Sequence, residues 1–125
     1  MSALRILLVD DEALARSRLR TLLGDCTAPA SVVAAEAGDA VQAMGALQRQ
    51  PFDAVLLDIH MPGVDGLALA KLIASLPRPP AVVFVTAHAG HAVQAFALEA
   101  VDSLTKPVRL ERLRPALQKV GRVAA

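Results

Sequence analysis

Residues 4–11 read Leu-Arg-Ile-Leu-Leu-Val-Asp-Asp, a run of mostly aliphatic side chains that ends in two acids. Such a short apolar run is typical of a strand buried inside a parallel sheet. Three further runs of strand length are each followed by a polar residue: 54–57 by Asp58, 81–85 by Thr86, and the weaker run 101–105 by Lys106. Because the carboxyl ends of parallel strands meet at one edge of an open sheet, we expect these polar side chains to converge there.

Segments with helical periodicity alternate with these runs, a pattern typical of repeated βα units. The expected helices span residues 12–23, 40–49, 67–76, 90–99 and 110–120, and a further strand spans 30–35. Gly24 is expected to end the first helix, and Pro62 with two glycines delays the third until about Leu67. The sequence therefore predicts a single α/β domain with a five-stranded parallel sheet.

The composition argues against several classes of protein. Thirteen basic and twelve acidic residues give a formal net charge of +1, which does not favour nucleic-acid binding by electrostatics alone. Aromatic residues make up only 2% of the chain, so base stacking is not expected. The lone Cys26 cannot form an internal disulfide, and neither a signal-peptide pattern nor an apolar run of about 20 residues occurs. We expect a cytoplasmic protein that does not enter a membrane.

Clustered acids constrain the chemistry of the predicted site. Asp10, Asp11 and Asp58 repel one another at a partly dry edge unless a cation offsets their charge. Mg²⁺ characteristically binds one or two carboxylates, several waters and phosphate oxygens, so Mg²⁺ is the expected cofactor. Asp58 stands alone at the end of the presumed central strand, where a carboxylate can attack phosphorus. We therefore predict Asp58 as the nucleophile, with Lys106 and Thr86 contacting the phosphoryl oxygens.

Four motifs follow one another along the chain: Leu8-Val9-Asp10-Asp11-Glu12, Leu57-Asp58-Ile59-His60-Met61-Pro62-Gly63-Val64-Asp65-Gly66, Val85-Thr86-Ala87 and Lys106-Pro107. Through them the chain closely resembles the receiver domain of bacterial two-component response regulators over essentially its whole length. The resemblance implies a flavodoxin-like (βα)5 fold with strand order 2-1-3-4-5 and helices on both faces. It also implies that residues 1–125 form one receiver domain, with a linker to an effector domain near residues 120–125.

The resemblance further implies a phosphorylation-controlled signalling switch that is not a conventional enzyme. Asp58 would accept a phosphoryl group from a sensor histidine kinase. Asp11 would bind Mg²⁺ directly, Asp10 would help through water, and the backbone carbonyl of His60 would be a further ligand. Phosphorylation would then change the conformation or the dimerisation of the domain to regulate an output.

The segment Ala100–Pro107 resembles the LytTR-type subgroup, whose members usually carry a DNA-binding domain after the receiver. DNA binding would come only through such an effector domain, which these 125 residues do not include. In the family the Lys106–Pro107 bond is usually cis. Because some receivers pair when phosphorylated, a phosphorylation-dependent homodimer is also expected.

One position departs from the family pattern. Ser103 stands where receivers usually carry Tyr or Phe, so the usual coupling between the threonine and an aromatic ring is not expected in its ordinary form. His60 and His88 each lie two residues beyond a predicted site residue, where family members tune hydrolysis of the phosphoryl group. Ala87 belongs to the same switch region. Phosphorylation is expected to survive the change, while the output switch is expected to differ.

Simpler roles stay open for single residues. One of the paired acids could cap the first helix, Thr86 could cap a strand, and Lys106 and the basic residues near the C-terminus could be solvated. For the whole chain, one alternative is a phosphorylation-independent protein-interaction module, which Ser103 favours. A less favoured alternative is a Mg²⁺-dependent aspartyl phosphohydrolase. Enzymes of that kind place a second Asp two residues after the nucleophile, where this chain has His60.

Overall fold

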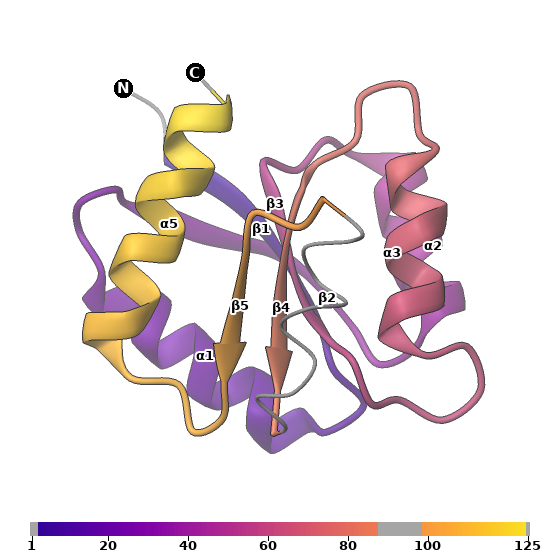
Figure 1. Cartoon of the computed structure of the whole chain (residues 1–125), viewed down its shortest axis with the longest axis horizontal. Coiled ribbons are helices and arrows are strands. Elements are labelled where there is room, and N and C mark those ends of the chain that lie inside the picture. The colour runs from indigo at the N-terminus through magenta and orange to yellow at the C-terminus, as the bar shows by residue number, and fades with distance from the viewer. Residues whose placement is uncertain (1–2, 88–98, 125) are drawn as a thin grey trace.

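The computed structural model describes residues 3–87 and 99–124 of the chain. Its centre is a five-stranded parallel sheet in the order β2-β1-β3-β4-β5 (Figure 1). The strands are β1 (Leu4–Val9), β2 (Ser31–Ala37), β3 (Ala54–Asp58), β4 (Ala81–Thr86) and β5 (Asp102–Thr105). The number, direction and order of the strands confirm the predicted fold class.

Helices cover both faces of this sheet. The described helices are α1 (Ala13–Asp25), α2 (Ala40–Arg49), α3 (Gly66–Ala74) and α5 (Leu110–Ala124). In Figure 1, α1 and α5 lie on one side of the sheet, and α2 and α3 lie on the other. Ile6 and Leu8 of β1 are buried in the cluster under α1 and α5, whereas Leu7 and Val9 are buried under α2 and α3. A strand that is apolar on both faces needs cover on both, so the sequence of β1 requires this layered arrangement.

Some boundaries differ from the prediction for local reasons. α1 continues through Gly24, and its C-cap is Cys26, which is buried in the core. β3 extends to Asp58, which pairs with Val85 of β4. α3 begins one residue earlier than predicted because Asp65 caps it, its Oδ1 accepting a hydrogen bond from the Ala68 N–H at 2.9 Å.

Two further expectations concern the second half of the chain. Residues 88–98, which include most of the helix expected over 90–99, lie outside the described part. Residues 120–124, where a linker was expected to begin, belong to α5. No described helix combines the length and the apolar surface of a membrane span.

Candidate functional site

Three carboxylates converge at the carboxyl edge of the sheet. Asp10 follows β1, and Asp58 is the last residue of β3, which pairs directly with β1. One carboxylate oxygen from each of Asp10, Asp11 and Asp58 lies within 4.8 Å of the others. Asp10 and Asp58 are only 1% and 5% exposed, whereas Asp11 faces solvent. Parallel topology thus brings together acids that are far apart in the sequence.

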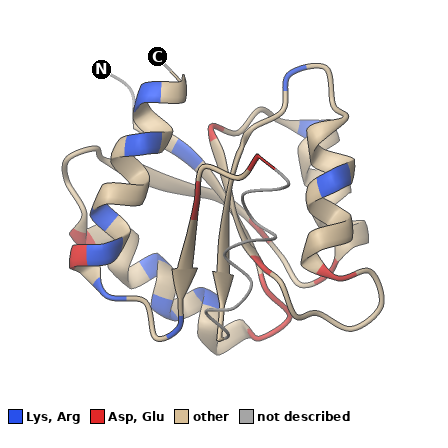
Figure 2. Cartoon of the chain, viewed as in Figure 1, with Lys and Arg blue, Asp and Glu red and all other residues tan. Residues whose placement is uncertain are grey.

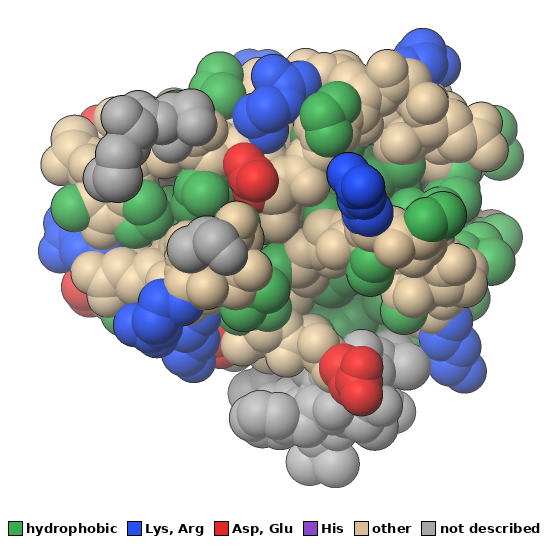
Figure 3. All heavy atoms as spheres, turned by 90° about the horizontal axis from the view of Figure 1, so that it is seen from above, with side chains coloured by type: hydrophobic (Ala, Val, Ile, Leu, Met, Phe, Trp, Pro, Cys, Tyr) green, Lys and Arg blue, Asp and Glu red, His purple; other side chains and the backbone are tan. Residues whose placement is uncertain are grey.

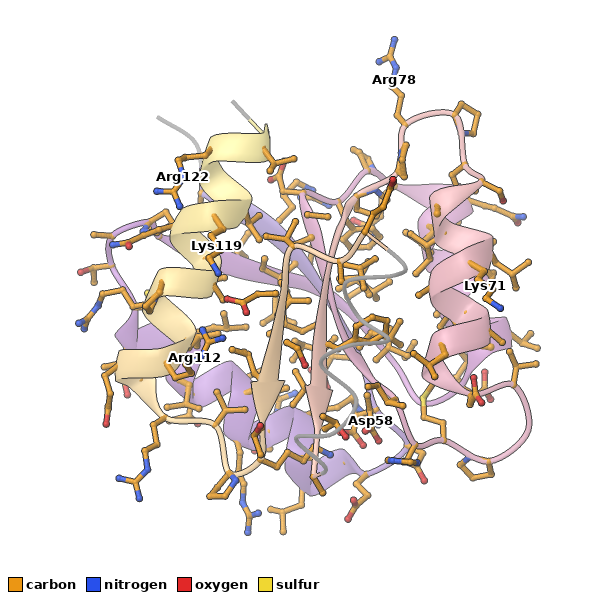
Figure 4. All side chains as sticks on the ribbon, in the orientation of Figure 1. Asp58, Lys71, Arg78, Arg112, Lys119 and Arg122 are labelled. Atoms are coloured by element: carbon orange, nitrogen blue, oxygen red, sulfur yellow. The ribbon has the colours of Figure 1, made fainter. Side chains whose placement is uncertain are left out.

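Both ends of the sheet carry charged side chains. Figure 4 shows Asp58 at the end toward which the strand arrows point, and Figure 2 shows other acidic segments near it. The opposite end faces the viewer in Figure 3, where the described residues show basic side chains and separate acidic ones. The carboxyl edge therefore holds clustered acids, with basic segments on α1 and after β5 beside them.

Lys106 brings a positive charge to these acids. It follows β5, and its Nζ lies 2.9 Å from Asp10 Oδ2 and 3.8 Å from Asp58 Oδ1. Its backbone N–H donates to the carbonyl of Thr86 at 2.7 Å, which joins the ends of β4 and β5. Thr86 is fully buried, and the Lys106–Pro107 bond is cis. The interpretation of Lys106 as a solvated surface lysine is therefore wrong.

The carboxylates and the lysine perturb one another. Burial is the largest cause that raises the pKa of Asp58 above its ordinary value, the charge of Lys106 opposes it, and the charges of Asp10 and Asp11 add to it. Burial alone would lower the pKa of Lys106, but its hydrogen bond to Asp10 and the charge of Asp58 raise it above its ordinary value. Without a cation, the site holds more negative charge than one lysine neutralises.

The loop after β3 folds back onto the end of the strand. The Gly66 N–H donates to the Ile59 carbonyl at 2.8 Å, and the His60 N–H donates to Asp58 Oδ1 at 3.3 Å. A Cβ at Gly66 would lie 2.1 Å from the Asp58 carbonyl oxygen, so this close approach of two backbone segments requires glycine. The side chain of His60 is exposed. The loop accordingly keeps the His60 backbone beside the acids.

Arg16 on α1 is a neighbour of the site that the sequence analysis missed. Its Nη1 donates to the Asp10 carbonyl at 2.6 Å, and its Nε pairs with Glu36 of β2 at 2.9 Å. The Asp10 N–H donates to the Ala37 carbonyl at 3.1 Å, and Asp10 Oδ1 accepts from the Glu12 N–H at 2.9 Å. The N-cap of α1 is Glu12, whose side chain makes no capping bond, so neither of the paired acids is the cap.

The remaining predicted residues flank this arrangement. Ser103 is half-buried in β5, where it pairs with Phe84 of β4. Ala87 is exposed directly after β4, and His88 lies outside the described residues. The tuning roles predicted for these positions stay predictions.

The basic face expected on α5 is not simply solvated. Arg112 Nη2 and Lys119 Nζ, both labelled in Figure 4, lie 2.7 Å and 3.1 Å from the carboxylate oxygens of Asp102 on β5. Burial alone would raise the pKa of Asp102, but hydrogen bonds from Arg112, the Ser103 backbone and Lys119 hold that pKa below its ordinary value. Two side chains of α5 are therefore attached to the edge strand.

The donor set at the acidic edge fits a small divalent cation. Its candidate ligands are carboxylate oxygens, which are hard donors of the kind that Mg²⁺ binds. Asp11 is exposed, so solvent can reach the cluster and complete a coordination sphere. The chemistry of these residues therefore suits Mg²⁺ rather than a soft, thiolate-binding metal.

Comparison with known proteins identifies the family. A family model described as the response regulator receiver domain matches residues 6–118. The chain belongs to this family. It is 44% identical over 119 residues to the positive alginate biosynthesis regulatory protein of Pseudomonas aeruginosa, a match that covers 95% of this chain and 48% of that protein. It is 38% identical over 120 residues to the sensory transduction protein LytT of Bacillus subtilis, with coverages of 96% and 49%.

A solved receiver shows the same arrangement of elements. The response regulatory domain of protein MrkE from Klebsiella pneumoniae superposes with a TM-score of 0.85 at 35% identity, covering 96% of this chain and 97% of that domain. The similarity to LytT and to LytR of Staphylococcus haemolyticus confirms the expected subgroup. This receiver domain spans about half the length of the curated relatives it matches. Receiver domains are phosphorylation-controlled signalling modules; they bind Mg²⁺ in an acidic pocket and are phosphorylated by histidine kinases.

Proposed function

We propose that this receiver is switched by transfer of a phosphoryl group from a sensor histidine kinase to Asp58, in a reaction that requires Mg²⁺. The observation that carries the proposal is the convergence of three carboxylates within 4.8 Å beside the ammonium of Lys106. Such an excess of negative charge favours a divalent cation, and the lysine favours an incoming phosphoryl oxygen. The proposed kinase partner implies a cytoplasmic location and a signalling role rather than that of a conventional enzyme.

The acids would hold the cation. Asp10, Asp11 and Asp58 offer carboxylate oxygens, and the His60 backbone beside them offers a carbonyl as a further ligand. When bound, Mg²⁺ supplies charge neutralisation that lets a carboxylate approach the negatively charged phosphoryl group. In its absence, Lys106 offsets part of the same charge through its ion pair with Asp10.

In the proposed transfer, an oxygen of Asp58 forms a bond to phosphorus while the bond between phosphorus and the donor's imidazole nitrogen breaks. That nitrogen keeps the electron pair of the broken bond, and because the donor's other ring nitrogen carries a proton before the transfer, a neutral imidazole is left. Lys106 Nζ, 3.8 Å from Asp58 Oδ1, would pair with one phosphoryl oxygen. Thr86, at the end of the neighbouring strand β4, would donate its hydroxyl to another.

Intact-protein mass spectrometry tests the proposal. After incubation with acetyl phosphate or phosphoramidate and Mg²⁺, the wild type should gain the mass of one phosphoryl group, and chelation of the metal should prevent the gain. Asp58→Asn should not be labelled. Asp65→Asn is the matched control, because Asp65 is an exposed carboxylate in the same loop and Asn also caps helices well. A wild type that stays unmodified, or a labelled Asp58→Asn, would contradict the assignment.

The output of the switch follows the same proposal. We expect phosphorylation to favour a homodimer, and contact with DNA would come through an effector domain outside this chain. Sedimentation of untreated and beryllofluoride-treated protein measures the dimer, and identical monomers in both samples would exclude it.

His60 and His88 are proposed to set the lifetime of the aspartyl phosphate, with Ala87 and Ser103 in the switch region. Unchanged dephosphorylation rates in His60→Ala and His88→Ala would remove the two histidines from the account.

Ser103 supports a second candidate function, a protein-interaction module that works without phosphorylation. At its position opposite Phe84 in the register of β4 and β5, a serine carries no ring to respond to movement of Thr86. Under this candidate, a partner would bind wild type and Asp58→Asn equally well, with or without a phosphodonor. Phosphodonor-dependent binding of a partner, or phosphodonor-dependent dimerisation, would decide for the switch.

A further inference from the structure

Arg16 connects the acidic edge to the outer strand β2. Its Nη1 donates to the Asp10 carbonyl at 2.6 Å, while its Nε pairs with Glu36 Oε1 at 2.9 Å. The side chains of Arg16 and Glu36 are 20% and 25% exposed, so both are partly shielded from water. One planar guanidinium therefore joins α1, β2 and the peptide that follows β1.

The carbonyl that Arg16 contacts lies in the middle of the acidic pair. It belongs to the same planar peptide unit as the Asp11 N–H, so its orientation fixes the direction in which Asp11 leaves β1. The Asp10 N–H donates to the carbonyl of Ala37, the neighbour of Glu36, at 3.1 Å. The end of β2 thus holds Asp10 twice, once through its own backbone and once through Arg16. Hydrogen bonds from a charged donor are stronger than neutral ones, which makes the second contact the firmer of the two.

We propose that Arg16 is a positioning residue for the Mg²⁺ site, which fixes the geometry of Asp10 and Asp11 as ligands by holding the peptide between them. The inference rests on the proposed Mg²⁺ site. Arg16 acts through the backbone of the ligands, and Glu36 anchors it.

The anchor is a stable charge at neutral pH. Burial alone would raise the pKa of Glu36, but hydrogen bonds from Arg20 and Arg16 outweigh that effect and hold the pKa below its ordinary value. Glu36 therefore stays ionised and keeps the guanidinium of Arg16 directed along the end of β2.

Arg20 provides a matched control on the same helix. It lies one turn after Arg16, and its Nη1 also pairs with Glu36, through Oε2. Among the described residues, Arg20 pairs with Glu36 and makes no ion pair with Asp10. Replacing Arg20 therefore removes an ion pair to the same carboxylate but leaves the contact to the Asp10 carbonyl in place.

The experiment measures Mg²⁺ affinity by isothermal titration calorimetry and, on the same metal-free proteins, the free energy of unfolding in urea. Arg16→Ala should weaken Mg²⁺ binding about tenfold, as expected when a residue that orients metal ligands is lost. Arg20→Ala should bind Mg²⁺ as the wild type does. Arg16→Lys should fall between wild type and Arg16→Ala, because one ammonium cannot reproduce the planar fork that contacts both partners.

The outcomes separate the inference from the proposed function. Equal Mg²⁺ affinity in wild type, Arg16→Ala and Arg20→Ala would overturn the positioning role and leave the Mg²⁺ site standing. If both alanine variants lose Mg²⁺ affinity equally, and the loss matches the decrease in their free energies of unfolding, Arg16 has a merely structural role. A wild type that binds no Mg²⁺ would refute the proposed function and this inference together. If Arg16→Ala does not fold, Arg16→Lys against Arg20→Lys gives the same comparison, and weaker binding in the first alone supports the inference.

Discussion

Replacing Asp58 by Asn is expected to stabilise the metal-free protein at neutral pH. At 4.8 Å, the upper limit of the separations between these carboxylate oxygens, two like charges repel by about 3.5 kcal/mol at an effective dielectric constant of about 20. Asp58 is repelled by two such charges, those of Asp10 and Asp11. The attraction between Asp58 and Lys106, 3.8 Å apart, offsets this repulsion by about 4.4 kcal/mol. The balance is a repulsion of about 2.5 kcal/mol, which solvent around the exposed Asp11 reduces to about 1–2 kcal/mol. The variant should be more stable than the wild type by that amount.

The raised pKa of Asp58 fixes how this difference depends on pH. Burial is the main cause of the rise, so the folded protein favours the protonated carboxyl more than the unfolded chain does. Below the ordinary value of 3.8, Asp58 is protonated in both states, and the difference should be smallest. As the pH rises through the folded pKa, the wild type loses stability relative to Asp58→Asn. The full difference should be present at neutral pH.

Far-ultraviolet circular dichroism can follow the unfolding, since the chain has no Trp or Tyr for intrinsic fluorescence. At neutral pH without Mg²⁺, the melting temperature of Asp58→Asn should be several degrees above that of the wild type, and its urea midpoint should be higher. Mg²⁺ should stabilise the wild type more than the variant, because a ligand stabilises the form that binds it. The control Asp65→Asn should change stability little. An Asp58→Asn protein less stable than wild type at neutral pH without metal would refute the reasoning.

Substitutions of Gly66, Asp102 and Lys106, with Gly24→Ala as a control, test the packing and charges in the rest of the domain. Gly66→Ala should lower the free energy of unfolding by about 3 kcal/mol, because the new Cβ would lie 2.1 Å from a backbone carbonyl oxygen. Gly24→Ala, at a helical position with open space, should raise it by up to about 1 kcal/mol. Similar urea midpoints for the two variants would contradict this expectation. Asp102→Asn should cost about 1 kcal/mol at neutral pH. The pKa of Asp102 is lower in the folded protein than its ordinary value of 3.8. The stabilisation by its ionised carboxylate is therefore present above pH 3.8 and is lost as the pH falls through the folded pKa. The unfolding curves of variant and wild type should accordingly converge in acid. Lys106→Met should cost about 2 kcal/mol by leaving the buried Asp10 without its ion pair, and Mg²⁺ should restore most of the loss in thermal unfolding; a loss of equal size with Mg²⁺ would count against the shared site.

The fold could be predicted because burial on both faces leaves a strong mark in the sequence. β3 is buried at every position, and all but one residue of β1 is buried, so both read as nearly continuous apolar runs. The resemblance to receivers then added the strand order. Helix ends were harder to predict, because single contacts decide them. The cap from Asp65 starts α3 earlier than the glycines suggested, and the buried Cys26 carries α1 past Gly24.

The acids and the side chains that hold them differ in how they are positioned. Asp10 and Asp58 are brought together by backbone topology alone, since each stands at the end of a strand and β1 pairs with β3. Their convergence therefore follows from the pattern of strands before any side chain is considered. This is why the acidic edge could be derived from the sequence.

Long side chains that cross between elements follow no such rule. Arg112 and Lys119 are seven residues apart, so helical spacing shows that they share a face of α5. It does not show that Asp102 lies under that face, because this depends on where the helix packs on the sheet. The contacts of Arg16 depend in addition on where β2 ends. Its guanidinium must reach both Glu36 on β2 and the Asp10 carbonyl after β1. A contact that requires two packing geometries at once leaves no periodic signal in one sequence, so the residues that orient a site are harder to predict than those that form it.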